Sequence, residues 1–473
     1  MTEALWTWHD LVAATGGIAD GAPSQAINGF SIDTRTLQPG DVFVALKDQR
    51  DGHDFVTSAF KAGAAAALVS AAYQRRHGDG ALIRASAPLR ALELIGIAAR
   101  ARLSPAARVI AVTGSAGKTG TKEMLRSCCA RLGKVHASEK SYNNHWGVPL
   151  TLARMPANTQ YAVFEIGMNH AGEIRPLAKM VHPHAAIITT VEAVHLEHFA
   201  SVDGIADAKA EIFEGLRPGG TAIIKRDNPH HNRLQASARA HGAHVISFGF
   251  GADADASAQN GVLGDDGSQM TVRLGTRHIA YRLAMPGRHV AENSLAVVAA
   301  LDAINADVEA AVAALATLVP PGGRGARTLL TVRGGDVLLI DESYNANPAS
   351  MRAALMTLGA VPRAKFARRI AVLGDMLELG PEAAALHTGL ADAVAEAGTD
   401  FIFACGPHMK GLYDAMPGAM KGAYAVSAAA LEAPLVEALR AGDAVMIKGS
   451  NGTRLAPLVE TLQTRFRAAD GAA

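Results

Sequence analysis

The sequence predicts an α/β protein of three domains. Its 473 residues exceed one typical domain, since domains hold roughly 100–200 residues each. Short apolar runs that end at glycine or aspartate alternate with helical stretches, which is typical of mostly parallel sheets covered by helices. Breaks rich in proline, glycine or serine lie at 104–105 and 320–323. We therefore predict domains at 1–106, 107–319 and 320–473.

The composition narrows the class of protein. Apolar residues make up 49% of the chain and charged residues 19%, a balance typical of globular proteins with well-filled cores. The formal net charge of +1 disfavours nucleic acid and anionic lipid as partners. No apolar run is long enough to predict a membrane span, and the N-terminus lacks the pattern of a signal peptide. The three cysteines have neither disulfide-framework nor metal spacing, so we expect a cytoplasmic protein.

Each block has its own pattern of elements. In the first, the apolar run 41–46 precedes a helix-like stretch that ends in 61–70, and a second Ala-rich helix is expected at 87–103. In the second, 250–268 reads as a turn-rich excursion before a hairpin at 270–284 and a helix pair at 290–317. The expected strands of the second block are 108–114, 161–167, 185–191 and 221–225. Those of the third, a second doubly wound sheet of Rossmann-like type, are 336–341, 368–374, 400–406 and 443–449.

The strongest local signal is the segment TGSAGKTGTKEM at 113–124, which a strand enters and a helix leaves. Gly114 and Gly117 let the backbone curl so that N–H groups face phosphate oxygens. Lys118 supplies positive charge for the β- and γ-phosphates, and Thr119 can place its hydroxyl on Mg²⁺. We predict a P-loop nucleotide site rather than a structural glycine turn. The other loop residues expected at the nucleotide are Ser115, Ala116 and Gly120.

Two polar residues follow strands of the same predicted sheet. Glu165 stands at the carboxyl end of an apolar run, where a carboxylate can hold Mg²⁺ directly or through water. The alternative is a helix cap or a surface glutamate, and we favour the metal. His195 opens the HLEH segment 195–198, but no third ligand makes a zinc site evident. On spacing alone, a hydrogen-bonded histidine is the favoured interpretation of His195.

Lys209 lies on an apolar helical stripe with Ile205, Ala208 and Ile212. The favoured interpretation is a lysine whose head group reaches water past its apolar neighbours. The alternative is a desolvated lysine with a lowered pKa, which could take up CO₂ as a carbamate and hold magnesium.

Two loops of the third block carry candidate ligand groups. The segment DESYNANP at 341–348 follows a strand, and its polar and aromatic groups suit contact with a base, a ribose or a substrate. The alternative is an Asn/Pro turn. Lys448 follows another strand and could meet an anionic substrate. The candidates in the first loop are Asp341, Tyr344, Asn345 and Asn347.

Together these motifs resemble the Mur ligase family over essentially the whole chain. TGSAGKT resembles the family's ATP loop, and 163–174 resembles the segment that carries a magnesium-binding glutamate, here Glu165. The stretch 195–213 resembles one in which a histidine binds magnesium and a lysine is carbamylated, which raises His195 and Lys209 to expected metal ligands. The resemblance thus implies ATP and Mg²⁺ as cofactors and a central ATPase domain.

Further segments of the resemblance assign substrate contacts. Asn293 is expected at the adenine, and Arg324 at the ATP phosphates. The segment 31–55 resembles a UDP-sugar-binding module, which makes the N-terminal domain a substrate domain. The segment 140–151 resembles one that contacts the peptide side of the substrate. The candidates are Ser31, Asp33, Thr34 and Arg35 in the first segment and Asn143 and Asn144 in the second.

Within the family, SYNANP at 343–348 and VLGDMLELG at 372–380 resemble the member that adds D-alanyl-D-alanine to UDP-N-acetylmuramoyl-tripeptide. The implied reaction passes through an acyl phosphate and supplies a peptidoglycan precursor. We expect a monomer whose domains close about 320–323. Asp375 and His387 could act as the base that takes the proton of the incoming amine, but nothing in the sequence distinguishes them from ordinary surface residues.

Three alternatives remain. The first is another Mur-type ligase, either the tripeptide-forming member or folylpolyglutamate synthase, which would lack the N-terminal segment. The second is a P-loop ATPase of another class, in which 336–343 serves as a Walker-B strand. The third is a binding protein that kept the fold without activity.

Overall fold

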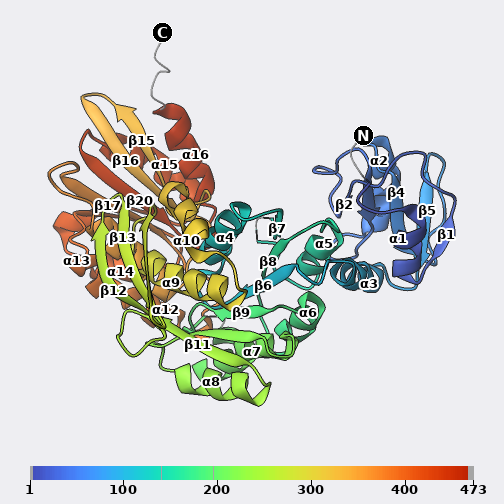
Figure 1. Cartoon of the computed structure of the whole chain (residues 1–473). Coiled ribbons are helices and arrows are strands. Elements are labelled where there is room, and N and C mark those ends of the chain that lie inside the picture. Colours follow the sequence, from blue (N-terminus) through green and yellow to red (C-terminus); the bar gives the residue numbers. More distant parts are fainter. Residues whose placement is uncertain (1–3, 140, 195, 467–473) are drawn as a thin grey trace, which may run out of the picture.

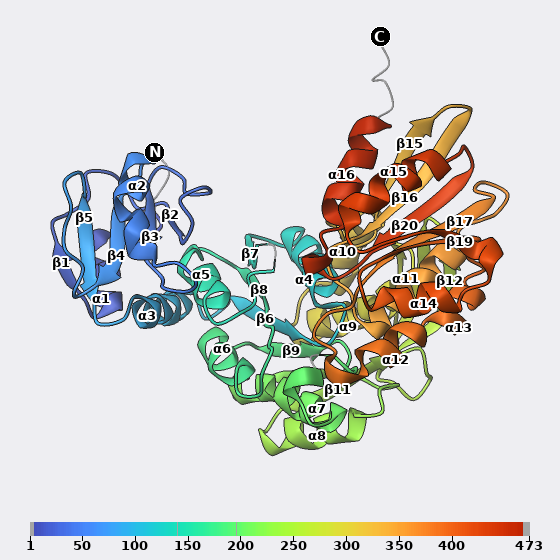
Figure 2. The same ribbon diagram turned by 180° about the vertical axis from the view of Figure 1, so that it is seen from behind.

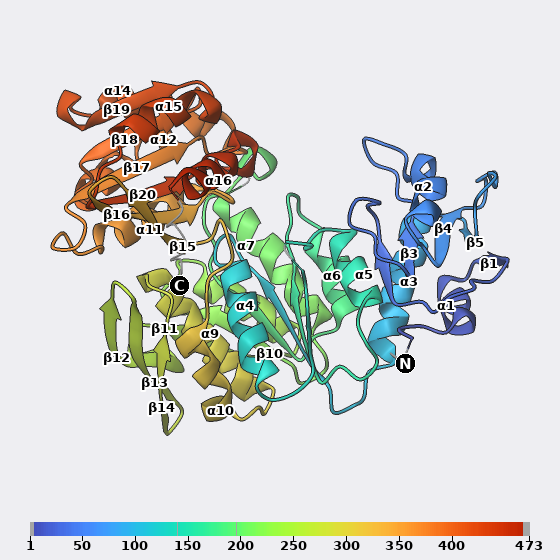
Figure 3. The same ribbon diagram turned by 90° about the horizontal axis from the view of Figure 1, so that it is seen from above.

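The computed structural model describes residues 4–139, 141–194 and 196–466, and it contains three successive α/β units (Figure 1). The first unit and the last lie at opposite ends of the central one, as the views from behind and from above also show (Figures 2 and 3). Each unit has its own sheet, of five, nine and six strands. The predicted α/β class with parallel-dominated sheets is confirmed, while the exact domain boundaries stay a prediction.

The N-terminal unit has the strand order β1-β5-β4-β3-β2, parallel except for β1. The segment 61–70 was predicted as the end of a helix, and this prediction is wrong. The helix ends at Lys61, Gly63 takes a positive φ of 100°, and the next residues form a strand between two neighbours. Burial in the sheet outweighs the helix preference of alanine. The elements are α1 Trp8–Thr15, β1 Ile18–Asp20, β2 Gly29–Ser31, β3 Asp41–Val44, η1 Gly52–Phe55, α2 Val56–Lys61, β4 Ala66–Ser70, β5 Ala81–Ala85 and α3 Pro88–Ala101.

The central unit has the strand order β14-β13-β12-β11-β10-β9-β6-β8-β7, with parallel pairing from β7 to β12. Alternate residues of β6 face two cores: Val109 and Ala111 pack under one face, Ile110 and Val112 under the other. The first half contains β6 Arg108–Thr113, α4 Lys118–Ala130, β7 Val135–Ala137, α5 Gly147–Ala153, β8 Tyr161–Glu165, α6 Ile174–Val181, β9 Ala185–Ile188, η2 Leu196–His198, α7 Val202–Ala210, η3 Glu211–Gly215 and β10 Thr221–Lys225.

The predicted turn-rich excursion at 250–268 is mostly wrong. A nine-residue strand, β12, runs through it and pairs antiparallel with β13. Its residues from Asn260 to Leu263 are exposed, so the strand lacks the alternating apolar pattern that would reveal it. The second half of the unit contains α8 His231–Ala240, β11 His244–Gly249, β12 Ala256–Gly264, β13 Gly267–Leu274, β14 Arg277–Leu283, α9 Arg288–Ala303, α10 Val308–Val312 and η4 Ala313–Thr317.

The C-terminal unit has the order β15-β16-β20-β17-β18-β19, parallel except for the β15–β16 pair. All four predicted strands are present, and two edge strands escaped prediction. The elements are β15 Ala326–Val332, β16 Gly335–Glu342, α11 Pro348–Gly359, β17 Arg368–Gly374, η5 Gly380–Glu382, α12 Ala383–Thr388, α13 Ala391–Glu396, β18 Phe401–Cys405, α14 Met409–Ala415, η6 Gly418–Met420, β19 Lys421–Ala425, α15 Ala428–Ala438, β20 Asp443–Lys448, η7 Asn451–Thr453 and α16 Ala456–Arg465.

The helices are too short or too polar to cross a bilayer. Within the described residues, none combines the length and the apolar character that a membrane span needs.

Candidate functional site

A cleft of about 780 Å³ lies between the central and C-terminal units. The central unit contributes the loop 115–120, the carboxyl ends of β8 and β9, and the start of α9. The C-terminal unit contributes the segments 342–354, 377–379 and 448–452. No described residue before Ser115 lines the cleft, so it is a two-unit site in this conformation.

The phosphate loop is held in a shape that only glycine permits. A Cβ at Gly114, where φ is 147°, would collide with Thr189, and one at Gly117, where φ is 80°, would collide with the Asn293 amide. Ser115 exchanges two hydrogen bonds with the backbone of Glu192, and the Thr189 hydroxyl donates to Ala116 O over 2.5 Å. The loop is therefore fixed from the neighbouring strand, with its backbone turned into the cleft.

Helix α4 begins at Lys118, directly after this loop, so its positive dipole end faces the cleft. The Lys118 Nζ donates to Gly114 O over 2.6 Å. Desolvation lowers the pKa of Lys118; the Glu165 carboxylate opposes this shift and the Arg324 cation adds to it. A phosphate that entered the loop would replace the carbonyl as the partner of this ammonium.

Glu165 is the last residue of β8 and its side chain is buried. The Thr119 hydroxyl donates to one carboxylate oxygen and the Asn143 amide to the other, each over 2.7 Å. A hydroxyl and a carboxylate side by side are the hard oxygen donors that Mg²⁺ takes, usually together with substrate phosphates and water. The described residues contain no cluster of three His, Cys, Asp or Glu around a common point. The donor set thus fits a magnesium ion shared with a nucleotide better than a protein-only metal cage.

Lys209 lies in α7 with only 2% of its surface exposed. The favoured prediction, that its head group reaches water, is therefore wrong. The helix packs its lysine face inward, because Ile205, Ala208 and Ile212 on the same stripe belong to the hydrophobic core. Desolvation, reinforced by the charge on Lys118, lowers the pKa of Lys209 well below its usual value. His195 lies outside the described residues.

Arg324 bridges the two units across the cleft. Its guanidinium stacks over the Tyr344 ring at 4.1 Å and donates to the Ser141 hydroxyl over 3.0 Å. Tyr344 and Asn345 are both exposed on the cleft wall. The predicted nucleotide contacts Asn293, Arg324, Tyr344 and Asn345 are thus all brought to one cavity.

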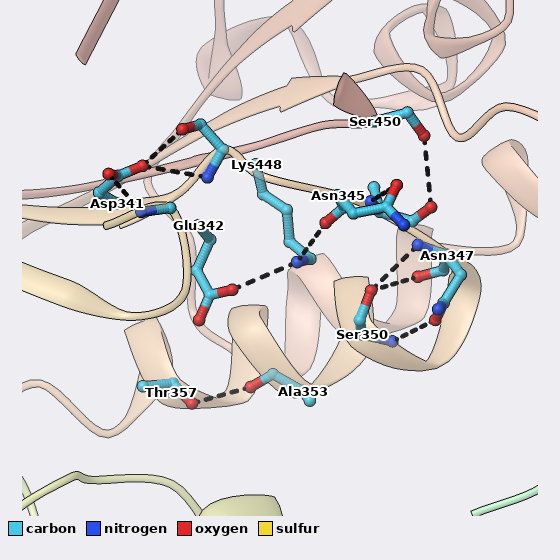
Figure 4. A network of polar contacts seen from close by, with 12 residues as sticks. Asp341, Glu342, Asn345, Asn347, Ser350, Ala353, Thr357, Lys448 and Ser450 are labelled. Carbon is cyan, nitrogen blue, oxygen red and sulfur yellow. Dashed lines mark hydrogen bonds and ion pairs between the residues drawn. The ribbon is translucent and has the colours of Figure 1, made fainter. Parts of the chain in front are cut away.

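The remaining C-terminal candidates are engaged in a polar network at the strand ends (Figure 4). The Asp341 carboxylate accepts the N–H of Gly323 and both the N–H and the hydroxyl of Ser343, and it does not line the cleft. Asn347 caps α11 and its amide donates to Ser115 O over 3.4 Å. Lys448 is buried and donates to Glu342 and to the Asn345 carbonyl.

The Walker-B alternative fails on topology. Asp341 lies in β16 of the six-stranded sheet, whereas the phosphate loop follows β6 of the nine-stranded sheet.

The two candidate bases, Asp375 and His387, are buried away from the cleft. The Asp375 carboxylate accepts the N–H of His408 and Met409, and His387 bonds to backbone atoms on both sides of its ring.

The predicted N-terminal contacts lie outside the cleft, whereas the predicted peptide-side contacts line it. Ser31 is the buried last residue of β2, and the other three follow it outside the cleft. Asp33 and Arg35 form an ion pair of 2.6 Å, and Thr34 is half-buried between them. Asn143 and Asn144 do line the cleft. The cleft residues that the sequence did not name as candidates include Thr189 and Glu192, which follow β9, and Glu342, the last residue of β16.

Both units that form the cleft match known protein families. The family model for the Mur ligase middle domain matches residues 112–301, and that for the Mur ligase glutamate ligase domain matches 326–451. The UDP-N-acetylmuramoyl-tripeptide--D-alanyl-D-alanine ligase of Escherichia coli is 35% identical over 92% of this chain and 94% of its own. The protein of that name from Rickettsia prowazekii is 31% identical over 97% and 100%. A crystal structure of MurF from Acinetobacter baumannii matches with a TM-score of 0.84, at 31% identity over 97% and 99%.

Proposed function

The chain belongs to the Mur ligase family, and from this premise we propose that it joins D-alanyl-D-alanine to UDP-N-acetylmuramoyl-tripeptide at the expense of ATP. The observation that carries the proposal is near full-length similarity, at 31–35% identity, to ligases that bear this name. The cleft supports it, because a phosphate loop faces a second unit across a cavity large enough for a nucleotide and an acceptor.

The reaction proceeds in two steps. The terminal carboxylate of the tripeptide attacks the γ-phosphorus of ATP and ADP leaves, which gives an acyl phosphate. The amine of D-alanyl-D-alanine then attacks the acyl carbon, the tetrahedral intermediate expels phosphate, and the amine loses a proton. The first step turns a poor electrophile into a good one. It also brings two anions together, so the site must supply positive charge.

Residues of this chain supply that charge and the alignment. Lys118 and the N–H groups of its loop bind the phosphates, and Arg324 reaches them from the opposite wall. Thr119 and Glu165 would hold Mg²⁺, together with His195 and a carbamate formed on the neutral amine of Lys209. When bound, the ion neutralises charge on the phosphates as a Lewis acid.

The substrate positions follow from the same scheme. Asn143 and Asn144 would contact the peptide side, and Ser31, Asp33, Thr34 and Arg35 the UDP-sugar. Lys448 and Asn347 line the cleft on the C-terminal side, where the incoming dipeptide enters. We place the protein in the cytoplasm as a monomer, where nucleotide-linked precursors and ATP are available.

The test is a reconstituted reaction. The protein is mixed with ATP, Mg²⁺, D-alanyl-D-alanine and either of two tripeptide substrates, ending in diaminopimelate or in lysine, and phosphate release and product mass are measured. Phosphate release that needs both substrates, with a pentapeptide mass, supports the proposal and identifies the third residue. Nucleotide binding without product from either tripeptide contradicts it and leaves a Mur-type ligase of another substrate.

A further inference from the structure

We propose that Lys122 positions Glu165, acting through Ser138, and so sets the affinity of the site for magnesium. The inference rests on the metal-binding role proposed for Glu165. Lys122 does not line the cleft, and its place one turn beyond Lys118 gives it no direct contact with a nucleotide.

The contacts form a continuous path. Lys122 has 1% of its surface exposed, and its Nζ donates to the carbonyl of Ser138 over 2.8 Å. Ser138 is equally buried, and its hydroxyl accepts the backbone N–H of Glu165 over 3.2 Å. The ammonium on α4 is therefore two hydrogen bonds away from the backbone of the proposed metal ligand.

These hydrogen bonds take the place of strand pairing between β7 and β8, which stops short of Glu165. β7 pairs with β8 only as far as Ala137 and Val163, two residues short of Glu165. Beyond that point Ser138 donates its N–H to Val163 O over 3.1 Å and its side chain takes over the next bond. On its other side Glu165 is aligned with β6. Without an anchored Ser138, the last residue of β8 would be fixed from one side only.

Helix α4 thus holds Glu165 at two points. Thr119 binds a carboxylate oxygen directly, and Lys122 binds the backbone through Ser138. Both residues belong to the helix that follows the phosphate loop, so the loop and the carboxylate are held in a fixed position relative to each other. A metal between them needs that fixed position, because Mg²⁺ demands near-ideal octahedral geometry.

A purely structural role for Lys122 makes a different prediction. Its ammonium also pairs with Glu123 at 2.5 Å, and Glu123 pairs with Arg126 at 2.6 Å. Replacing a buried ion pair with an apolar residue of similar volume is often neutral for stability. If packing and charge balance were the whole role, Lys122→Met would change neither the rate nor its dependence on magnesium.

The experiment compares three variants of the full-length protein. At saturating ATP and substrates, the free Mg²⁺ concentration that gives half the maximal rate is measured for Lys122→Met, Ser138→Ala and Arg126→Met. We expect the first two to raise it by roughly 10–100-fold, the usual cost of removing a group that orients a metal ligand. Arg126→Met removes only the second partner of Glu123 and should leave it unchanged.

A double variant and two further readouts make the test decisive. Lys122→Met/Ser138→Ala should lose little more than either single variant, because both break one path. The KM for the UDP-linked substrate and the melting temperature report general damage. If Lys122→Met does not fold, Ser138→Ala must still shift the magnesium dependence. The inference is overturned if the folded variants need the same free Mg²⁺ concentration as wild type for half the maximal rate. It is also overturned if Arg126→Met raises that concentration equally. Failure of the proposed function itself would differ, since wild type would then form no product.

Discussion

The central unit meets its two neighbours in opposite ways. Toward the N-terminal unit, one hydrophobic core runs without a break from Trp6 and α3 into α5 and α6. Side chains also bind carbonyls across that boundary: the Trp6 indole donates to Ala153 O over 3.0 Å, and Arg154 donates to Phe30 O over 2.8 Å. Toward the C-terminal unit the described cores are separate, and polar contacts such as Arg324 to Ser141 surround the cleft.

The two boundaries therefore suit different tasks: one holds two units in a fixed arrangement, and the other can open and close. A shared core makes the N-terminal and central units one body, so a UDP-linked substrate held on the first would present its peptide at a fixed place. A polar boundary costs little to open and close, because few apolar groups leave or enter water with it.

The shared core is tested by Trp6→Ala. The indole is buried, bonded to Ala153 and stacked at 3.9 Å from the Arg102 guanidinium. Its loss should reduce the free energy of unfolding by about 3–5 kcal/mol, as for other buried aromatic residues. Denaturant unfolding, followed by circular dichroism, measures this. Trp8 is a half-exposed neighbour, so Trp8→Ala should lower the free energy of unfolding clearly less. Equal losses in the two variants would mean that Trp6 contributes nothing specific to the boundary.

The proposed metal site is tested by Lys209→Met. We expect the ligase rate to fall by at least about 100-fold, the upper scale for disturbing a metal site, because the proposed carbamate ligand would be lost. Stability should rise rather than fall. Burial lowers the pKa of this lysine, so folding must deprotonate it at any pH between that lowered pKa and its unfolded value of 10.5.

The pH dependence of that gain follows from the sign of the shift. The unfolded chain binds one more proton than the folded chain between the two pKa values, so the destabilisation grows as pH falls through that window. The stabilisation by Lys209→Met should therefore be larger at neutral pH than above pH 10. Lys179→Met, on the exposed face of α6, should alter neither rate nor stability appreciably. Unfolding curves at both pH values decide this; a gain independent of pH would mean that the buried amine is charged.

The bridge across the cleft is tested by Arg324→Met. Its guanidinium spans Tyr344 and Ser141, and it should meet phosphate when ATP binds. We expect the KM for ATP to rise about tenfold, the scale of one hydrogen bond to a charged group. Arg327→Met is the matched control, since Arg327 also crosses between the units, to the Asp265 carbonyl, but lies outside the cleft. If both variants raised the KM for ATP equally, Arg324 would act by holding the two units together and not by binding ATP.

How far the sequence predicted these features depended on how local their causes are. The P-loop was predictable because Gly114, Gly117 and Lys118 act through backbone shape and helix geometry within a few residues. The burial of Lys209 was misjudged from its stripe alone, since whether that stripe faces water depends on the sheet above it. Strand β4 was taken for a helix because its alanines favour helix in isolation, and only its neighbours in the sheet decide otherwise.

The C-terminal loop shows the same limit within a single motif. DESYNANP at 341–348 was predicted as one ligand-binding group, and proximity in sequence was the only guide. In the fold Tyr344 and Asn345 face the cleft, whereas Asp341 turns back to bind the linker at Gly323. Asp341 lies within β16 and Tyr344 and Asn345 lie beyond its end, so partners from distant segments decide which residue faces the cleft.

The smallest effect concerns motion. If the contrast between the boundaries holds, ligand binding should move the C-terminal unit and leave the other two units fixed. Cysteines introduced at Ile18, Ala240 and Val426 place exposed labels in the three units, and the three native cysteines are buried. Double electron–electron resonance on pairs of labels, with and without an ATP analogue and both substrates, gives the distances.

We expect the 240–426 distance to change on binding and the 18–240 distance to stay constant, because only the first pair spans the polar boundary. A shift in both distances would show that the shared core does not lock the N-terminal unit. Constancy of both would show that the cleft is already closed, and that the proline- and glycine-rich linker at 320–323 is not a hinge. Trp6→Ala sharpens the test: it should broaden the 18–240 distribution and leave the 240–426 response intact, since the contacts named above for the two boundaries involve different residues.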